Sequence, residues 1–363
     1  MKKIISLILV LTLILSAFTL AGCSGDGQAD ENAITVCVVV SSAFGDKSFN
    51  DSAKEGADQL AEEFGVNVTT IECHEENFKQ SMMQAAEESD FVIPVGWQFY
   101  EISEVAGEYP DTKFIWVDNP AENIENLPNV LCITYAQNEG AFLAGYIAAN
   151  MTSSGVVGAV GGEDNNTIND FLVGYEQGAK YANPDVTVVT NYANDYEDPA
   201  KGKECALALH DQGADVIFQV AGNTGNGVFE AAAEQNFYVI GVDQDQKISA
   251  AEYDDQIICS MKKEVGKSIY DTIAAYINDG TWEGARVWTA DMSTGYVSIA
   301  YGDESSTQQV SDELKQQVED IAALIISGDI TVQTTRSLQF PQQLFFAHEG
   351  RSVKRYPFFY NKR

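Results

Sequence analysis

Residues 34–64 read ITVCVVVSSAFGDKSFNDSAKEGADQLAEEF and contain the repeating unit from which the fold can be predicted. The opening run, 34–40, is almost continuously apolar and β-branched, which is typical of a strand buried on both faces of a parallel sheet. Residues 50–64 have a helical period, and Gly65 follows them where helices commonly end. This stretch therefore predicts a strand, a polar loop and a helix in succession.

The same alternation of short β-branched runs and longer helical segments continues along the chain. Expected strands are 34–40, 66–71, 91–95, 113–117, 130–135, 156–160, 186–190, 215–220, 238–242 and 256–260. Expected helices are 50–64, 78–89, 139–151, 168–181, 199–212, 227–235 and 264–278. Such alternation predicts an α/β fold on parallel sheets. Ten strands are many for one sheet, and the pattern restarts near residue 139, so we expect two doubly wound lobes.

The N-terminal sequence indicates export to the outside of the cytoplasm. Two lysines precede an apolar run at 4–20, which leads into Ala21, Gly22 and Cys23. This pattern is typical of a lipoprotein signal peptide at 1–22, so we predict cleavage before Cys23 and acylation of its thiol. The polar residues of 23–33 then form a tether. The alternative is an ordinary signal peptide or membrane anchor with an incidental cysteine.

Composition argues against several classes of function. The 54 acidic and 21 basic residues give a net charge of −33, which opposes binding to nucleic acid or to an anionic membrane surface. The chain has no C-x-x-C pair, and its three histidines lie far apart, so neither a metal site nor a cofactor is expected. Cys37, Cys132 and Cys259 fall in apolar strand-like runs, which predicts buried thiols rather than a disulfide framework.

The last thirty residues differ from the rest of the chain. Residues 334–363 contain six basic residues and one acidic residue, with an aromatic cluster at 356–360. We interpret them as an atypical basic tail: an appendage, a frameshifted end or a fusion. The alternative is a basic extension that docks on the acidic body.

The sequence contains no recognisable catalytic arrangement. The glycine-rich run at 222–227 lacks the Gly-Lys-Ser/Thr of a phosphate loop and does not match G-x-G-x-x-G. No G-x-S-x-G elbow occurs, which argues against a hydrolase triad. We therefore expect a protein that is not an enzyme.

A small-molecule site is favoured instead, because polar and aromatic residues follow the predicted strands. Ligands of open α/β sheets bind beyond the carboxyl ends of the strands. Phe49 and Tyr196 lie in loops of this kind and could stack on a flat heterocycle or cover a sugar face. Asp243, with a lysine from Lys262 or Lys263, could bind sugar hydroxyls. Alternatively, Phe49 is a hydrophobic staple at a helix start and Asp243 a helix cap.

Taken together, these loop residues resemble the basic membrane lipoprotein family of transporter-associated binding proteins, whose best-known members bind purine nucleosides. The resemblance covers about 34–332 and consists of separate motifs in the family's order. The motifs are GDKSFN at 45–50, EGAFLAGY at 139–146, GG at 161–162, FLVGYEQG at 171–178, DPAKG at 198–202, AGNTGNG at 221–227, IGVDQDQ at 240–246 and SMKK at 260–263.

The resemblance implies roles for individual residues. Asp46 and Asn50 would read the base while Phe49 stacks on it, with Asp118 near the same edge. Tyr196 stands where the family usually has a stacking phenylalanine or tryptophan. Gly222 would bring backbone close to the ligand, and Asp243 with Lys263, or alternatively Lys262, would bind the ribose hydroxyls. Two departures from the family pattern are the foreign tail and the pair Trp97 and Gln98, which replace expected small residues.

The resemblance also implies a type I periplasmic-binding-protein fold, with the ligand in a cleft between two lobes joined by chain crossovers. We expect lobe I to comprise 34–138 and 262–285, and lobe II to comprise 139–261 and 286–333. The expected function is lipid-anchored capture of a nucleoside, with a purine expected, for an ABC permease and its ATPase at the extracytoplasmic face of the cell membrane. A monomer is expected.

Other roles remain open on the same fold. The ligand could instead be a pentose, a flavin precursor or a signalling sugar. The chain could also act as a sensor subunit for a membrane receptor.

Overall fold

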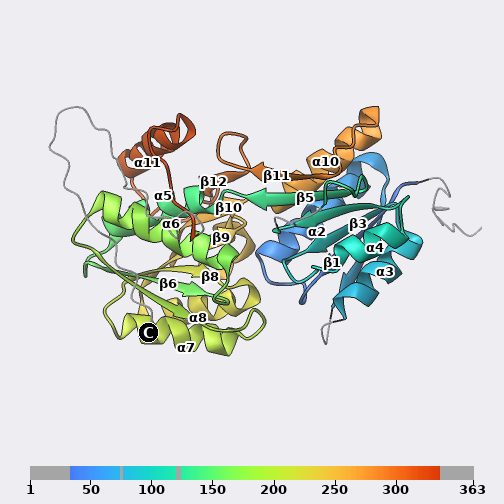
Figure 1. Ribbon diagram of the computed structural model, residues 1–363. Helices are drawn as coiled ribbons and strands as arrows, with labels where there is room; N and C mark the ends of the chain where they lie inside the picture. The colour runs from blue at the N-terminus through green and yellow to red at the C-terminus, as the bar shows by residue number, and fades with distance from the viewer. Residues whose placement is uncertain (1–32, 74–76, 120–123, 336–363) are drawn as a thin grey trace, which may run out of the picture. The chain divides into compact units, whose positions relative to one another are not determined.

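The chain folds into two six-stranded sheets, each wound by helices, in a computed structural model that describes residues 33–73, 77–119 and 124–335 (Figure 1). The signal peptide, Cys23, nearly all of the tether and all but the first two residues of the basic tail lie outside the described residues. All elements belong to the compact unit that begins at Ile34. The predicted α/β class and type I architecture are confirmed.

The two sheets repeat one strand order. The first sheet contains β1 (Thr35–Val40), β2 (Asn67–Glu72), β3 (Phe91–Val95), β4 (Lys113–Val117), β5 (Val130–Tyr135) and β11 (Arg286–Ala290). The second contains β6 (Val156–Gly161), β7 (Thr187–Tyr192), β8 (Val216–Val220), β9 (Tyr238–Asp243), β10 (Ile257–Lys263) and β12 (Val297–Ala300). Their orders are β2-β1-β3-β4-β5-β11 and β7-β6-β8-β9-β10-β12. Each sheet therefore has a topological switch point, at β1/β3 in the first and at β6/β8 in the second.

The helices fall where the sequence predicts them, with small differences at the ends. They are α2 (Phe49–Phe64), α3 (Phe78–Glu88), α5 (Gln137–Met151), α6 (Asn166–Ala182), α7 (Pro199–His210), α8 (Asn226–Gln235) and α10 (Val265–Asp279). Sequence analysis missed α4 (Ile102–Glu108), α9 (Gln246–Ser249) and α11 (Asp312–Ile326), and the strands β11 and β12. Short segments such as α4 and β12 contain too few residues to establish a period.

The expected division into lobes needs two corrections. We expected 286–333 to lie wholly in lobe II, but β11 pairs in parallel with β5 in the first sheet, with Arg286 opposite Leu131. Conversely, β10 carries Lys262 and Lys263 in the second sheet, where β12 pairs with it antiparallel. The physical reason is that β5 would otherwise leave its edge unpaired, and the returning chain supplies the missing hydrogen bonds. A five-residue strand has no signal in its sequence for the sheet that it joins.

Strand β1 shows why the sheets are continuously apolar. Val36, Val38 and Val40 face the core beneath α2 and α10, whereas Cys37 and Val39 face the core beneath α3 and α4. Because successive side chains of a strand point to opposite faces, a sheet covered by helices on both sides needs apolar residues at every position. All five cysteines of the described residues are buried, including the three predicted to be so.

Glycines let two helix pairs approach closely. A Cβ atom at Gly56 of α2 would overlap the backbone of Gly266 in α10. In the second lobe, a Cβ atom at Gly145 of α5 would overlap the carbonyl oxygen of Tyr175, and one at Gly178 of α6 that of Phe142. The side-by-side course of α5 and α6 is visible in Figure 1. Backbone contact of this kind fixes the distance between the helices.

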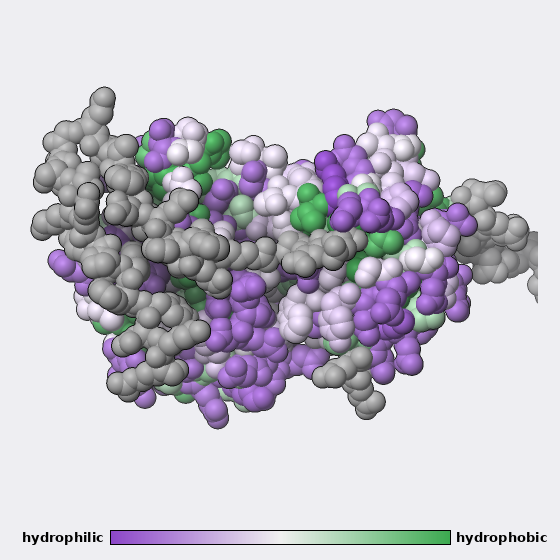
Figure 2. Space-filling view, in the orientation of Figure 1, coloured by the Kyte–Doolittle hydropathy of each residue, from purple (hydrophilic) through white to green (hydrophobic). Residues whose placement is uncertain are grey.

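Hydrophilic side chains dominate the face shown in Figure 2, with small apolar areas between them. Among the described residues, no helix combines the length and apolar character needed to span a membrane.

We predict that Gly178→Ala lowers the free energy of unfolding by about 1–3 kcal/mol, because the added methyl group forces α5 and α6 apart. Denaturant unfolding of the purified chain measures this change. Gly107→Ala in α4 is the matched control, since a Cβ atom there meets no atom within 4 Å. It should leave stability unchanged or raise it slightly, because alanine favours helix more than glycine does. Equal effects of the two substitutions would contradict the role of the α5–α6 contact.

Candidate ligand-binding site

A cavity of about 590 Å³ lies at the carboxyl ends of the strands of both sheets. Its volume is in the usual range for small-molecule sites. The structure brings all eight predicted ligand residues to its wall: Asp46, Phe49, Asn50 and Asp118 from the first lobe, and Tyr196, Gly222, Asp243 and Lys263 from the second. The residues after β1 and β3, and those after β6 and β8, also line it, so both switch points open into one cavity.

The backbone turns sharply where the strands end at this cavity. Asp118, which follows β4, has φ 73°, and Asp243, the last residue of β9, has φ 63°. Asn194, two residues after β7, has φ 53°. Left-handed backbone costs free energy for residues other than glycine and is concentrated at functional sites. Three of the six non-glycine residues with positive φ in the described chain thus lie at this cavity.

A buried lysine connects the two lobes within the cavity. The Nζ atom of Lys263 lies 2.7 Å from Oδ2 of Asp118, and only 2% of the lysine side chain is exposed. The same Nζ atom lies 4.6 Å from the ring centroid of Phe49 and 5.1 Å from that of Tyr135. The ammonium group therefore has an ion-pair partner and cation–π contacts that offset the cost of its burial.

Asp243 completes this charged group. Burial raises the pKa of its carboxyl, against the lowering effects of the Lys263 ammonium and of the Ser48 hydroxyl. Ser48 Oγ donates to Oδ2 of Asp243 at 2.5 Å, so this contact also joins the lobes. The cap of α9 is Asp245, whose side chain accepts a hydrogen bond from the backbone N–H of Lys247. Asp243 instead accepts its hydrogen bond from Ser48, which favours a role in the site over a role as a helix cap.

The structure distinguishes between the two candidate lysines. Lys263 points into the cavity, whereas Lys262 forms an ion pair with Glu264 and does not line the cavity. Neighbours on β10 point to opposite faces because the strand repeats every two residues. Only the register of β10 within the second sheet decides which lysine faces the ligand site.

Hydrogen bonds to neighbouring residues of the cavity wall fix the side chains of Asp46 and Asn50. The Asp46 carboxylate accepts hydrogen bonds from the backbone N–H groups of Ser48, Asn50 and Asp51 at 3.0, 2.9 and 3.1 Å, and so caps the start of α2. The Asn50 amide donates to Ser42 Oγ and to the carbonyl oxygen of Ala43, both at 2.9 Å. Their expected role in reading a base stays a prediction, and their internal bonds give them a structural role as well.

Tyr196 is the second aromatic side chain of the cavity wall. Its hydroxyl accepts a hydrogen bond from Nδ2 of Asn165 at 3.0 Å, and burial raises its pKa. Its ring lies so close to Gly162 that a Cβ atom there would overlap it. The predicted stacking residue is thus fixed in position by a polar contact that phenylalanine could not make.

Residue Gln246 of α9 reaches across to the first lobe. Its Nε2 donates to the carbonyl oxygen of Lys47 at 2.9 Å, and Oγ of Ser249 donates to the same oxygen at 3.2 Å. The Lys47 side chain forms an ion pair with Glu252. These contacts lie beside the Ser48–Asp243 hydrogen bond and add to the contact between the lobes.

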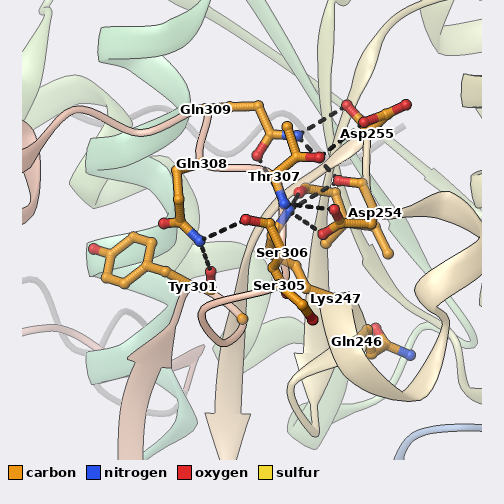
Figure 3. A network of polar contacts seen from close by, with 12 residues as sticks. Gln246, Lys247, Asp254, Asp255, Tyr301, Ser305, Ser306, Thr307, Gln308 and Gln309 are labelled. Carbon is orange, nitrogen blue, oxygen red and sulfur yellow. Dashed lines mark hydrogen bonds and ion pairs between the residues drawn. The ribbon is translucent and has the colours of Figure 1, made fainter.

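Helix α9 is itself held by Lys247, whose side chain is buried (Figure 3). Its ammonium pairs with the Asp254 carboxylate at 2.7 Å and donates to the carbonyl oxygen of Ile257 at 2.6 Å and to Gln309 Oε1 at 3.1 Å. Thr307 N donates to Asp254 Oδ2 at 2.6 Å, which joins the chain after β12 to the same network. The segment that carries Asp243 and Gln246 is therefore anchored within the second lobe.

Several cavity residues were not predicted as ligand residues. They are, among others, Ser41, Ser42, Phe78, Gln98, Glu163, Asn165 and Phe171. Glu163 and Asn165 follow β6, where polar strand-end residues could have been selected. Phe78 and Phe171 lie in helices and have the sequence pattern of core residues, so no signal separated them. No group of three or more potential metal ligands occurs in the part of the chain that the structure describes.

Comparison with known proteins identifies the family to which the chain belongs. Residues 33–336 match the family model described as ABC transporter substrate-binding protein PnrA-like. The chain belongs to this family. Membership in a family of substrate-binding proteins confirms that the chain is not an enzyme.

Three similar proteins illustrate the family relationship. Basic membrane protein A of Borreliella burgdorferi is 31% identical over 93% of this chain and 97% of its own length. The ABC transporter nucleoside-binding protein BmpA of Lactococcus lactis is 32% identical over 87% of this chain and 95% of its own. A crystal structure of an ABC transporter solute-binding protein from Aeropyrum pernix has a TM-score of 0.73 at 28% identity, covering 84% of this chain and 94% of that one.

We predict that the Asp46 carboxyl makes stability fall as pH rises. Burial raises its pKa from 3.8 to about 7, against the hydrogen bonds that it accepts from backbone N–H groups. A carboxyl with a higher pKa in the folded than in the unfolded state binds its proton more tightly when folded, so protonation favours folding. Its contribution is therefore greatest below about pH 4 and is lost as pH rises through about 7.

Unfolding free energies of the parent chain and of Asp46→Asn, measured across this pH range, test the prediction. The parent should lose on the order of 2–4 kcal/mol relative to the variant between the two ends of the range. Asp185→Asn, at an exposed position, is the control and should track the parent. A parent-to-variant difference that does not change with pH would remove Asp46 as the titrating group.

Proposed function

We propose that this chain is a lipid-anchored, extracytoplasmic substrate-binding protein that captures a nucleoside, with a purine as the preferred base, and delivers it to an ABC permease and its ATPase. The observation that carries the proposal is one cavity that combines the aromatic rings of Phe49 and Tyr196 with the charged group Asp118, Lys263 and Asp243. The relative from Lactococcus lactis, whose name describes nucleoside binding, supports the same ligand class.

The chemistry of the wall suits the two halves of a nucleoside. An aromatic ring stacks on a nucleobase with a gain of roughly 1–3 kcal/mol, whatever the base. A carboxylate accepts hydrogen bonds from the ribose hydroxyls, and a lysine ammonium donates to their oxygen atoms. Hydrogen bonds to charged groups contribute roughly 1.5–3 kcal/mol each, so Asp243 and Lys263 would favour a ligand with a ribose.

Ligand capture would favour closure of the lobes. A ligand that touches Phe49 in one lobe and Tyr196 in the other binds the closed arrangement more tightly than an open one, and this difference in affinity shifts the equilibrium. The hydrogen bonds of Ser48 with Asp243 and of Gln246 with Lys47 join the lobes in this structure and would stabilise the closed arrangement. A permease would then distinguish loaded from empty protein by its closed form.

We predict that Asp243→Asn weakens nucleoside binding roughly tenfold to a hundredfold, because a neutral amide replaces a charged acceptor. Calorimetry on the full chain purified in detergent should show binding of guanosine, inosine or adenosine, and none of ribose or free bases. Asp185→Asn should leave affinity unchanged. Binding of pentoses or flavins without nucleosides would overturn the ligand assignment, and unchanged affinity of Asp243→Asn would remove this residue from the site.

We also predict that Cys23 carries the lipid. Fatty-acid labelling of cells that express the chain should mark the parent protein, whereas Cys23→Ser should incorporate no label. Cys205→Ser, which alters a cysteine buried in the second lobe, is the matched control and should stay labelled. Equal labelling of Cys23→Ser and the parent would refute a lipid anchor at this position.

A further inference from the structure

The loop after β3 forms part of the cavity wall that the predicted ligand residues do not account for. Gly96, Trp97 and Gln98 all line the cavity, at the switch point of the first sheet. This loop lies next to the end of β1, where Ser41 and Ser42 line the same wall. It is also where this sequence departs from the pattern expected for its family.

The Gln98 side chain has an unused hydrogen-bond acceptor. Its Oε1 atom is buried and has no hydrogen-bond partner among the described residues. A buried acceptor without a partner lowers stability, so such groups are rare unless a ligand or other polar group completes them. By contrast, the amide group of Asn50 and the carboxylate of Asp46 on the same wall already have partners within the protein.

The backbone just before Gln98 is held in a defined position. The Gln98 amide folds back over Gly96, since Oε1 lies 2.5 Å from the place that a Cβ atom would take there. Gly96 has φ 116°, a conformation that other residues rarely adopt. The Gly96 carbonyl oxygen accepts a hydrogen bond from Nε1 of Trp116 at 2.7 Å. The loop is thus anchored to β4 before any ligand binds.

Aromatic side chains line the same cavity as Gln98. Trp97 is 40% exposed, and Phe78 packs edge-on against Phe99, with 5.3 Å between the ring centroids. Both Trp97 and Phe78 line the cavity with Gln98. Gln98 lines the same cavity as Phe49 and Tyr196, so a heterocycle stacked on those rings lies in the cavity that Gln98 borders.

We propose that Gln98 determines base specificity by accepting a hydrogen bond from an amino group on the ligand's heterocycle. The inference rests on the proposed function, since it assigns a preference within nucleosides. A site built to bind a donor discriminates strongly against an analogue that lacks it, because the acceptor is then left buried without a partner. The ligand class is a nucleoside whose base has an exocyclic amino group.

Two matched ligand pairs test this assignment. Adenosine differs from purine riboside by one amino group, and guanosine differs from inosine by one amino group. Calorimetry on the full chain in detergent should show that the amino member of at least one pair binds roughly tenfold more tightly. Gln98→Leu should reduce this ratio to near unity, whereas Gln98→Glu, which keeps an acceptor, should retain a preference for the amino compound.

Gln316→Leu, at an exposed position of α11, is the matched control and should behave as the parent. Melting temperatures of all variants without ligand check that the fold is intact. If the two members bind equally in both pairs, the role of Gln98 is overturned and nucleoside capture stands. The same conclusion follows if Gln98→Leu keeps the affinity ratio of the parent. If no nucleoside binds the parent chain, the proposed function fails and the inference fails with it.

Discussion

The ion pair between Lys263 and Asp118 joins the two lobes at the point where ligand would bind. An almost fully buried ammonium is tolerated only because a carboxylate lies 2.7 Å away and aromatic rings surround it. Asp118 belongs to the loop after β4 in the first sheet, and Lys263 ends β10 in the second. Formation of this pair therefore requires the carboxyl ends of both sheets to meet at the same cavity. The predicted ligand residues lie at these strand ends, so their positions depend on the same arrangement.

The rest of the molecule keeps those ends in place. Glycines at the α2–α10 and α5–α6 crossings bring helix backbones into contact, which leaves little freedom for the helices to shift. The Asp46 carboxylate fixes the start of α2, and Lys247 fixes the short helix α9 on the other side. Both lobes thus offer a rigid wall to the cavity, and hydrogen bonds and an ion pair join them beside it. Such an arrangement suits a protein that opens and closes around a ligand as two bodies.

The left-handed backbone conformations of the site cost free energy, which the stability of the surrounding sheets offsets. Asp118, Asn194 and Asp243 are held in left-handed conformations at strand ends, where glycine would be the easier choice. Asp118 and Asp243 also belong to the charged group, so the turn and the chemistry are provided by the same residues. Gly96 shows the other solution, since there the turn is made by glycine and the side chain of Gln98 occupies the space left open.

The amino-acid sequence by itself determined the α/β class, the two lobes and most helix and strand positions, and its resemblance to a known family implied the eight residues that line the cavity. The class, the lobes and the elements follow from local patterns, which are apolar runs buried on both faces and helical periods, while strand-end position by itself indicated only Phe49, Tyr196, Asp243 and one of two lysines. Tertiary structure alone decided the rest. The register of β10 placed Lys263 rather than Lys262 in the cavity, and the free edge of β5 took β11 into the first sheet. Likewise, Phe171 became a cavity residue only through packing, because its surroundings come from segments distant in sequence, and no local pattern encodes them.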